Sequence, residues 1–209
     1  MIISHLYKLV FIHIPKTAGS YIEQILHKID PDCLDIDFYE NDNHYGHIPF
    51  FKIKNMDIYK DISEYTFFTV IREPIDLIIS HYNYIITCNN SHYLYKDIYN
   101  KSLSESIDII LNYNNNLLLL YIANNYINDS EYLYNNINRK IEFLKFENIS
   151  FRFKQFLLKN GVELNKIDKI FSSDIVNKSI KYIDNIDINN IDEDKKKMIE
   201  LNKKLYDSL

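Results

Sequence analysis

The chain has 209 residues, of which 46% are hydrophobic, and its 12 Phe and 18 Tyr are enough to fill the core of one domain spanning residues 1–209. A formal net charge of −5 and a pI near 5.8 leave no basic surface for wrapping nucleic acid and disfavour a long polyanionic glycan as partner. The spacing of the two cysteines, Cys33 and Cys88, indicates neither a metal site nor a disulfide framework, so we expect two reduced thiols and no bound metal.

The first ten residues include His5 and Lys8 and lead directly into a strand-like segment, so they lack the apolar stretch of a signal peptide. The longest apolar run, Leu117 to Ala123, is far shorter than the roughly 20 residues that cross a bilayer. We therefore expect a soluble, cytoplasmic protein without a membrane span.

Short apolar runs alternate with helical patterns in the first half of the chain, which is typical of βαβ units and a mostly parallel sheet. Residues 9–14 predict a buried strand, and residues 34–38 are a weaker strand candidate. After a break at residues 15–19, a helix is predicted from about Ser20 to residue 29. Its apolar face recurs at helical spacing through Ile22, Ile25, Leu26 and Ile29.

A second strong strand is predicted from Thr66 to Ile71, where β-branched and aromatic residues end at the turn Arg72-Glu73-Pro74. Proline suits the first position of a helix, so a helix should begin at Pro74. The apolar face of that helix is formed by Leu77, Ile78, Tyr82, Ile85 and Ile86.

The second half is predicted to be mainly helical. Residues 104–138 have a helical pattern that clusters of Asn interrupt, and residues 141–146 predict a third strand. A helix over residues 149–160 should end at Gly161. The chain is then polar and less periodic until a last helix at about residues 193–206, whose acidic start suits the positive end of the helix dipole.

The segment from Phe11 to Ser20, Phe-Ile-His-Ile-Pro-Lys-Thr-Ala-Gly-Ser, joins the first strand to the first helix. The first N–H groups of a helix have no partner within it, and together with the helix dipole they favour an anion. Gly19 permits close approach of the backbone, Thr17 and Ser20 can add hydroxyl donors, and Lys16 supplies a cation. The lysine precedes the glycine, so this phosphate site is not a Walker A loop.

The stretch from His13 to Ser20 resembles the 5′-phosphosulfate loop of sulfotransferases that use 3′-phosphoadenosine 5′-phosphosulfate (PAPS). The form is that of the carbohydrate group that includes the heparan sulfate 2-O- and chondroitin sulfotransferases. The resemblance implies a P-loop-like, three-layer α/β fold with a central, mostly parallel sheet of four or five strands flanked by helices. It implies PAPS as the donor, bound by Pro15, Lys16, Thr17, Ala18, Gly19, Ser20 and Tyr21.

The segment from Phe68 to Tyr82 resembles the 3′-phosphate-binding segment of the same family, in which a strand ends in Arg-Asp/Glu-Pro and a serine follows. This implies that Arg72 and Ser80 hold the 3′-phosphate of the donor. Independently of the family, an arginine at the end of a strand can bind a phosphate with two N–H groups. The structural alternative is a surface arginine that is paired with Glu73 or Asp76. The family usually has a further arginine where this chain has Leu77, so one phosphate contact or salt bridge is expected to be missing.

Sulfuryl transfer needs a base for the acceptor proton and a cation at the leaving phosphate. Lys16 suits the second role. The segment His44-Tyr-Gly-His47-Ile-Pro-Phe resembles a Gly-His segment that carries the base in carbohydrate sulfotransferases, which implies His47 as the base with His44 able to assist. A structural histidine at position 47, or a carboxylate base at Glu40 or Glu64, is the alternative.

The other histidines near the two phosphate segments, His13 and His81, are expected to be packed or surface residues. Two later segments add weaker similarities to the same family. Residues 143–149 resemble the strand followed by Glu-Asp-Leu that often follows the core, and residues 176–179 resemble an Asn-x-Ser loop that can close over the nucleotide. Asn177 and Ser179 are therefore further candidates for donor contacts.

Together these features predict an enzyme that transfers the sulfuryl group of PAPS to a hydroxyl or amine, releasing PAP, without a metal. The acceptor is expected to be a carbohydrate or another small molecule. A nucleotide kinase or other phosphoryl transferase is a second hypothesis, disfavoured by the missing Walker A order and by the lack of a Mg²⁺-binding Asp after a strand. A non-catalytic member that binds nucleotide or glycan is the third.

Overall fold

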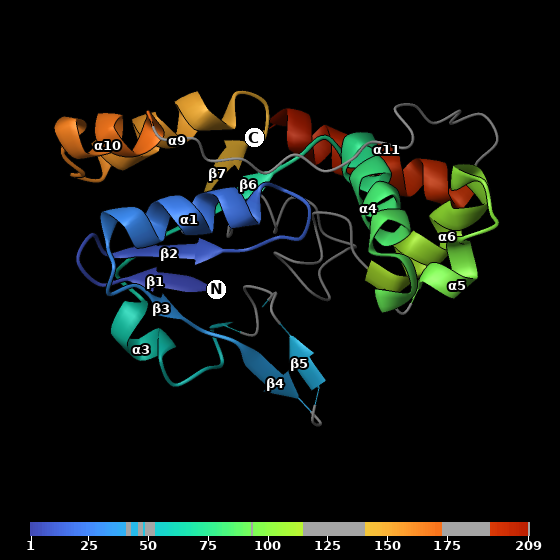
Figure 1. The fold of residues 1–209 in the computed structure, drawn as a ribbon, viewed down its shortest axis with the longest axis horizontal. Coiled ribbons are helices and arrows are strands. Elements are labelled where there is room, and N and C mark those ends of the chain that lie inside the picture. Colours follow the sequence, from blue (N-terminus) through green and yellow to red (C-terminus); the bar gives the residue numbers. More distant parts are fainter. Residues whose placement is uncertain are drawn as a thin grey trace. The chain divides into compact units, whose positions relative to one another are not determined.

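A computed structural model describes residues 1–40, 43–45, 48, 53–92, 94–114, 141–172 and 193–208. The chain divides into two compact units (Figure 1). Unit 1 contains Met1–Ile71 and Tyr121–Asn177, and unit 2 contains Arg72–Leu120 and Lys178–Leu209. The expectation of a single domain stays a prediction.

Unit 1 is built on a five-stranded sheet with the strand order β3-β1-β2-β6-β7. The three strands β2, β6 and β7 are parallel, and β1 is antiparallel to both of its neighbours. Their bounds are Ile2–Ser4 for β1, Leu9–Ile12 for β2, Leu34–Asp35 for β3, Thr66–Ile71 for β6 and Ile141–Lys145 for β7. A separate hairpin pairs β4 (Phe38–Glu40) with β5 (Asn43–Tyr45).

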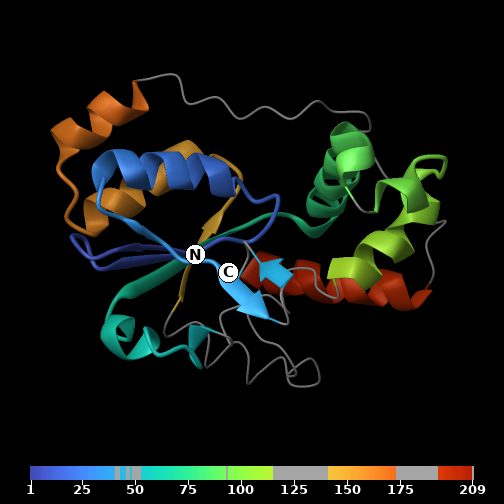
Figure 2. The same cartoon turned by 60° about the horizontal axis from the view of Figure 1, so that its bottom comes forward.

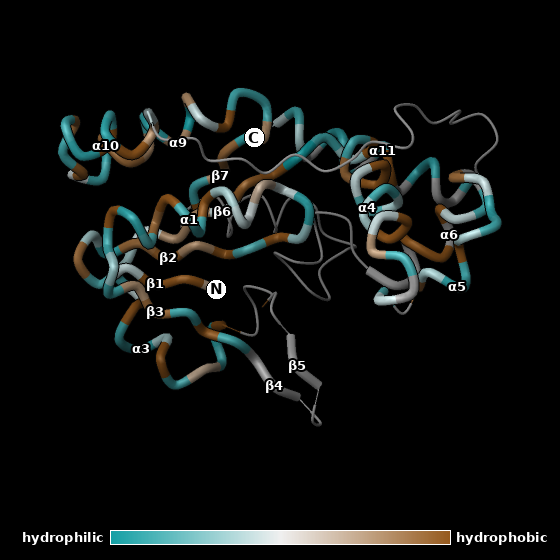
Figure 3. Tube along the Cα trace, in the orientation of Figure 1, coloured by the Kyte–Doolittle hydropathy of each residue, from teal (hydrophilic) through white to brown (hydrophobic). Residues whose placement is uncertain are grey.

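The side chains of β6 alternate between two apolar layers, as a strand buried on both faces requires. The ring of Phe68 packs 4.4 Å from Phe156 and 5.2 Å from Phe11, between ring centroids. The ring of the preceding residue, Phe67, lies with its centroid 6.0 Å from that of Tyr59 in the short helix α3 (Tyr59–Ile62). Strand β6 is therefore covered from both sides, and strands β1 and β2 are also largely hydrophobic (Figure 3).

Three helices gather on one face of this sheet: α1 (Gly19–Ile29), α9 (Ile149–Lys159) and α10 (Leu164–Phe171) (Figures 1 and 2). The apolar face predicted for α1 is confirmed, because Ile22, Ile25, Leu26 and Ile29 are all buried in the core of the unit. Helix α9 ends as predicted before Gly161, which has a φ of 83°.

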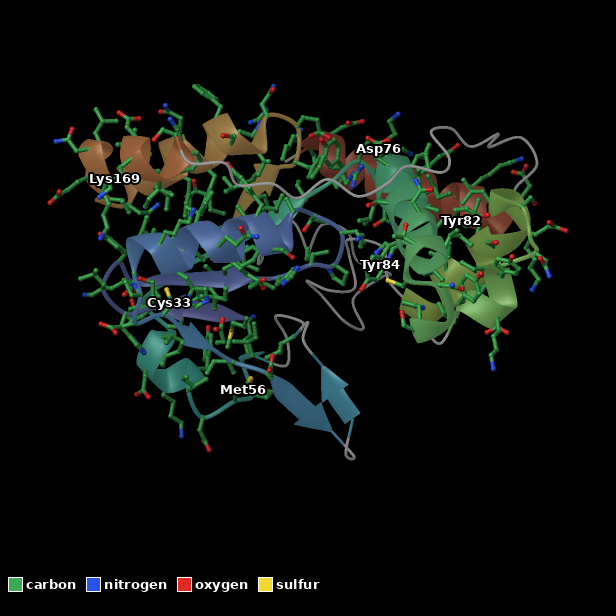
Figure 4. All side chains as sticks on the ribbon, in the orientation of Figure 1. Cys33, Met56, Asp76, Tyr82, Tyr84 and Lys169 are labelled. Carbon is green, nitrogen blue, oxygen red and sulfur yellow. The ribbon has the colours of Figure 1, made fainter. Side chains whose placement is uncertain are left out.

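Unit 2 is helical over its described residues. It contains α4 (Pro74–Cys88), a short 3₁₀ turn (Asn89–Ser91), α5 (Tyr95–Ile98), α6 (Leu103–Asn114) and α11 (Glu193–Ser208). Helix α4 begins at Pro74 as predicted and buries Leu77, Ile78, Tyr82 and Ile85. The Tyr82 side chain is buried, and its hydroxyl donates a hydrogen bond to the carbonyl oxygen of Lys101 over 3.1 Å (Figure 4).

The α/β fold with a mostly parallel central sheet is confirmed. Among the elements that the sequence analysis missed are strand β1 and helix α10. Strand β1 has only three residues and joins the sheet by pairing with β2. Three residues are too few to form a recognisable alternation of apolar and polar side chains. Helix α10 lies in the stretch that sequence analysis treated as polar and less periodic. Its buried side chains among the described residues are Ile167 and Ile170, Phe171 packs on the core while partly buried, and Leu164 is 55% exposed, so the apolar face of the helix is narrow.

No helix within the described ranges is long and apolar enough to cross a bilayer.

Candidate active site

The loop after β2 lies at the edge of the sheet where parallel strands end. Strand β2 pairs in parallel with β6 from Leu9 opposite Thr66 to Ile12 opposite Thr69, and β7 continues the parallel sheet beyond β6. The loop follows Ile12 and enters helix α1 at Gly19. In α/β sheets this carboxyl edge is where ligands bind, so the fold puts the predicted phosphate loop at a suitable edge.

The loop has an unusual backbone for its residue types. Lys16 and Ala18 both have left-handed conformations, with φ of 65° and 68°. Such conformations cost free energy for residues with a Cβ and persist where the surroundings impose them, often at functional sites. One constraint is Thr17, which is fully buried and donates its hydroxyl hydrogen to the carbonyl oxygen of Ile14 over 2.8 Å. The hydroxyl predicted to face a ligand thus braces the loop itself.

At the amino end of helix α1, Ala18 is the N-cap and its side chain makes no capping hydrogen bond. The Ala18 carbonyl oxygen accepts from the N–H groups of Tyr21 and Ile22 over 3.0 and 3.1 Å. The N–H groups of Gly19 and Ser20 therefore have no acceptor within the helix. Lys16, which is half-buried, and Ser20, which is exposed, belong to the same short segment and supply a cation and a hydroxyl. This arrangement suits an anion such as a phosphate or phosphosulfate.

Gly19 has a role that sequence analysis missed, because it leaves room for the side chain of His13. A Cβ at this position would overlap the imidazole of His13, which lies directly against the glycine. Its Nδ1 lies 2.7 Å from Oε1 of Glu23, one turn further along α1, and its ring stacks on Phe11 with centroids 5.6 Å apart. The prediction that His13 is a packed residue is consistent with its 13% side-chain exposure, but its packing partner is the phosphate loop.

The Tyr21 side chain, the last in the predicted donor loop, packs on other helices. Its ring meets Phe171 of α10 edge-on at 6.4 Å, and burial raises the pKa of its hydroxyl while a hydrogen bond with Ser150 opposes that shift. The side chain therefore anchors α1 to its neighbours.

The predicted 3′-phosphate segment starts unit 2. Glu73 is the N-cap of α4, and its Oε2 accepts from the N–H groups of Ile75 and Asp76 over 2.8 and 3.0 Å. Arg72 precedes this cap and Ser80 lies on α4, both half-buried. Leu77, which replaces the arginine usual in the family, is 2% exposed within the core of this unit.

The predicted base and the late loop fall outside the described residues, since His47, Asn177 and Ser179 are not among them. His44 pairs with Tyr39 in the β4–β5 hairpin, and Glu40 pairs with Asn43. Glu64 is exposed and precedes β6, so it lies at the amino edge of the parallel strands, opposite the phosphate loop. Its position disfavours Glu64 as a base acting at that loop.

Among the described residues of unit 1, Cys33 is the thiol to consider as an alternative nucleophile. Cys33 lies beyond the carboxyl end of α1 (Figure 4), and burial, followed by the charge of Asp30, raises the pKa of its thiol to about 12. Such a thiol is a poor nucleophile, because the thiolate is the reactive form. Within the described part of the chain, no group of three or more His, Cys, Asp or Glu could hold a metal.

Comparison with known proteins assigns the family. The model of the sulfotransferase family matches residues 1–198, nearly the whole chain. The chain therefore belongs to this PAPS-dependent family, which includes carbohydrate sulfotransferases, and it is an enzyme that transfers sulfate. Searches of curated proteins and of solved structures give no match.

Proposed function

We propose that this sulfotransferase moves the sulfuryl group of PAPS to a hydroxyl or amine of a carbohydrate or small molecule by in-line displacement. The loop from Pro15 to Ser20 holds the 5′-phosphosulfate, and Arg72 and Ser80 hold the 3′-phosphate. The observation that carries this proposal is the amino end of α1, which follows a parallel strand and whose N-cap residue, Ala18, comes two residues after Lys16 and has no capping side chain. Backbone donors and a lysine at one loop are suited to a phosphosulfate.

The chemical roles follow from the bonds that change. A bond forms between the acceptor atom and sulfur while the bond from sulfur to the bridging phosphate oxygen breaks, which leaves PAP. His47 takes the proton that the acceptor loses, as a neutral imidazole can at physiological pH. Lys16 stabilises the charge that develops on the phosphate oxygen.

The assignment of the base to His47 rests on its place in the sequence, after strand β5 and directly before the buried residue Ile48. The segment also carries the Gly-His pattern that resembles the family's base segment.

A neutral acceptor fits the overall charge better than a polyanion. The net charge of −5 would repel a long sulfated or carboxylated glycan unless a local basic surface compensated for it. We therefore place an uncharged sugar hydroxyl, or a small hydroxylated or amine compound, first in an acceptor panel.

Ligand-dependent unfolding tests the donor. The unfolding temperature of the protein should rise with PAP and stay unchanged with ATP and Mg²⁺, because a ligand that binds only the folded state stabilises it. Stabilisation by ATP and Mg²⁺ without an effect of PAP would indicate a phosphoryl transferase and sink the proposal. Release of PAP from PAPS in the presence of each panel member then identifies the acceptor.

The base is tested by His47→Ala. Turnover should fall by about 100-fold or more with unchanged PAP affinity, the usual contribution of a positioned base. His5→Ala is the matched control, because the His5 imidazole bonds to the Tyr65 hydroxyl at 2.9 Å next to the amino end of β6. Unchanged turnover in His47→Ala would remove it from this role and direct attention to His44 and Glu40.

A further inference from the structure

The imidazole of His13 bridges the two sides of the phosphate loop. His13 lies just beyond the last residue of β2, whereas Gly19 and Glu23 lie on α1 one helical turn apart. The ring occupies the space that a side chain at Gly19 would need, and its Nδ1 is 2.7 Å from Glu23. The His13 ring thus links the end of strand β2 directly to the first turn of α1, in addition to the chain connection through residues 14–18.

The ring is held from more than one direction. It stacks on Phe11 with an interplanar angle of 21°, and the hydrogen bond to Glu23 fixes its rotation. Phe11 is itself fully buried and packs on Phe68 of the neighbouring parallel strand. The position of the imidazole is therefore set by the core of unit 1, and a displacement of the first turn of α1 would have to break this packing.

The loop needs such a constraint. Two residues with a Cβ, Lys16 and Ala18, hold left-handed conformations directly before the first turn of α1. Left-handed backbone is unfavourable for these residue types, so a free loop would relax toward other conformations. Relaxation would turn the N–H groups of Gly19 and Ser20 away from the position that an anion uses.

We propose that His13, oriented by Glu23, is a positioning residue for the donor: it fixes the first turn of α1 so that its N–H groups face the 5′-phosphosulfate. The role rests on the proposed placement of that group at the loop. It also accounts for the glycine at position 19, because any larger residue would expel the ring. His13 acts through the backbone of the loop and takes no part in the chemical step.

The first test compares two ligands. His13→Ala should weaken PAP binding by about tenfold, equivalent to 1.4 kcal/mol, and should leave adenosine 3′-monophosphate binding within about twofold of wild type. The second ligand lacks the 5′-phosphate, so a loss of fold would weaken both ligands alike. His5→Ala is the control and should change neither affinity.

The second test is a double-mutant cycle between His13 and Gly19. Gly19→Ala alone should weaken PAP binding by about tenfold or more, whereas the same change in the His13→Ala background should have less than about a twofold effect, because the ring it would strike is gone. Glu23→Ala should reproduce the effect of His13→Ala and should add little to it.

The outcomes separate this inference from the proposed function. Normal PAP affinity in His13→Ala, equal weakening of both ligands, or additive effects in the cycle would overturn the positioning role alone. A wild-type chain that fails to bind PAP would overturn the donor site and this role together.

Discussion

Two helices that follow parallel strands begin in opposite ways. Helix α1 follows β2, and its N-cap residue, Ala18, provides no side-chain cap for the N–H groups of the first turn. Helix α4 follows β6, and the carboxylate of Glu73 already accepts from the N–H groups of Ile75 and Asp76. The same local arrangement of strand, turn and helix thus begins with an N-cap that lacks a polar side chain in unit 1 and with an acidic cap in unit 2.

The difference bears on the proposed roles of the two segments. A 5′-phosphosulfate can be held by the backbone of α1 and by Lys16. A 3′-phosphate at the second segment must rely on side chains, of which Arg72 and Ser80 are the proposed ones, because an acidic residue occupies the start of α4. A carboxylate at that position would repel a phosphate aimed at the helix axis.

The largest effect is expected from removal of the Lys16 side chain in the loop before α1. Lys16→Ala should lower turnover by about 100- to 1,000-fold, the range for loss of one group that stabilises charge in the transition state. Lys8→Ala is a matched control. Like Lys16, Lys8 has a left-handed backbone conformation, with a φ of 52°, but it lies in the turn between β1 and β2. Equal losses in the two variants would point to backbone strain as the cause.

The proposed 3′-phosphate segment should depend on Arg72 for its affinity for PAP. Arg72→Ala should weaken PAP binding by about 1.5–3 kcal/mol, the scale of a hydrogen bond to a charged group, and should leave adenosine 5′-monophosphate binding unchanged. Titration calorimetry with both nucleotides measures this. Arg152→Ala serves as the control, because its exposed guanidinium bonds to the Glu147 carbonyl at 2.9 Å. Full PAP affinity in Arg72→Ala would move the 3′-phosphate elsewhere.

Removing the cap should make the two helix starts more alike. Glu73→Ala should lower the free energy of unfolding by about 1 kcal/mol, as losses of N-caps usually do, and should not weaken PAP binding. Urea denaturation and calorimetry measure the two effects. A clear loss of PAP affinity would show that Glu73 takes part in donor binding beyond its capping role.

The smallest effect concerns Ala18, the N-cap of α1, whose backbone has a left-handed conformation. Ala18→Gly should raise the free energy of unfolding by up to about 1 kcal/mol, because glycine adopts a φ of 68° without steric cost. PAP affinity should stay within about twofold of wild type if the loop conformation is already fixed in the free protein. A large gain in affinity would instead indicate that the free loop samples other conformations.

The sequence predicted the elements whose side chains follow a clear period. Strand β6 has the predicted bounds of Thr66 and Ile71, and helix α1 buries the predicted apolar face, because both are long enough for burial to leave a pattern. Strand β1 and helix α10 were missed, since their place in the core depends on partners far along the chain. The roles of Lys16, Arg72, Ser80 and His47 stay predictions.

By itself, the sequence determined the family. It also predicted an anion-binding loop, because a lysine and a glycine between a buried strand and an amphipathic helix suit an anion wherever they occur. Only the tertiary structure decided how that loop is held. The contacts of His13 with Gly19 and Glu23, the bond from Thr17 to Ile14 and the cap formed by Glu73 depend on side-chain directions. Those directions follow from packing, which no short motif records.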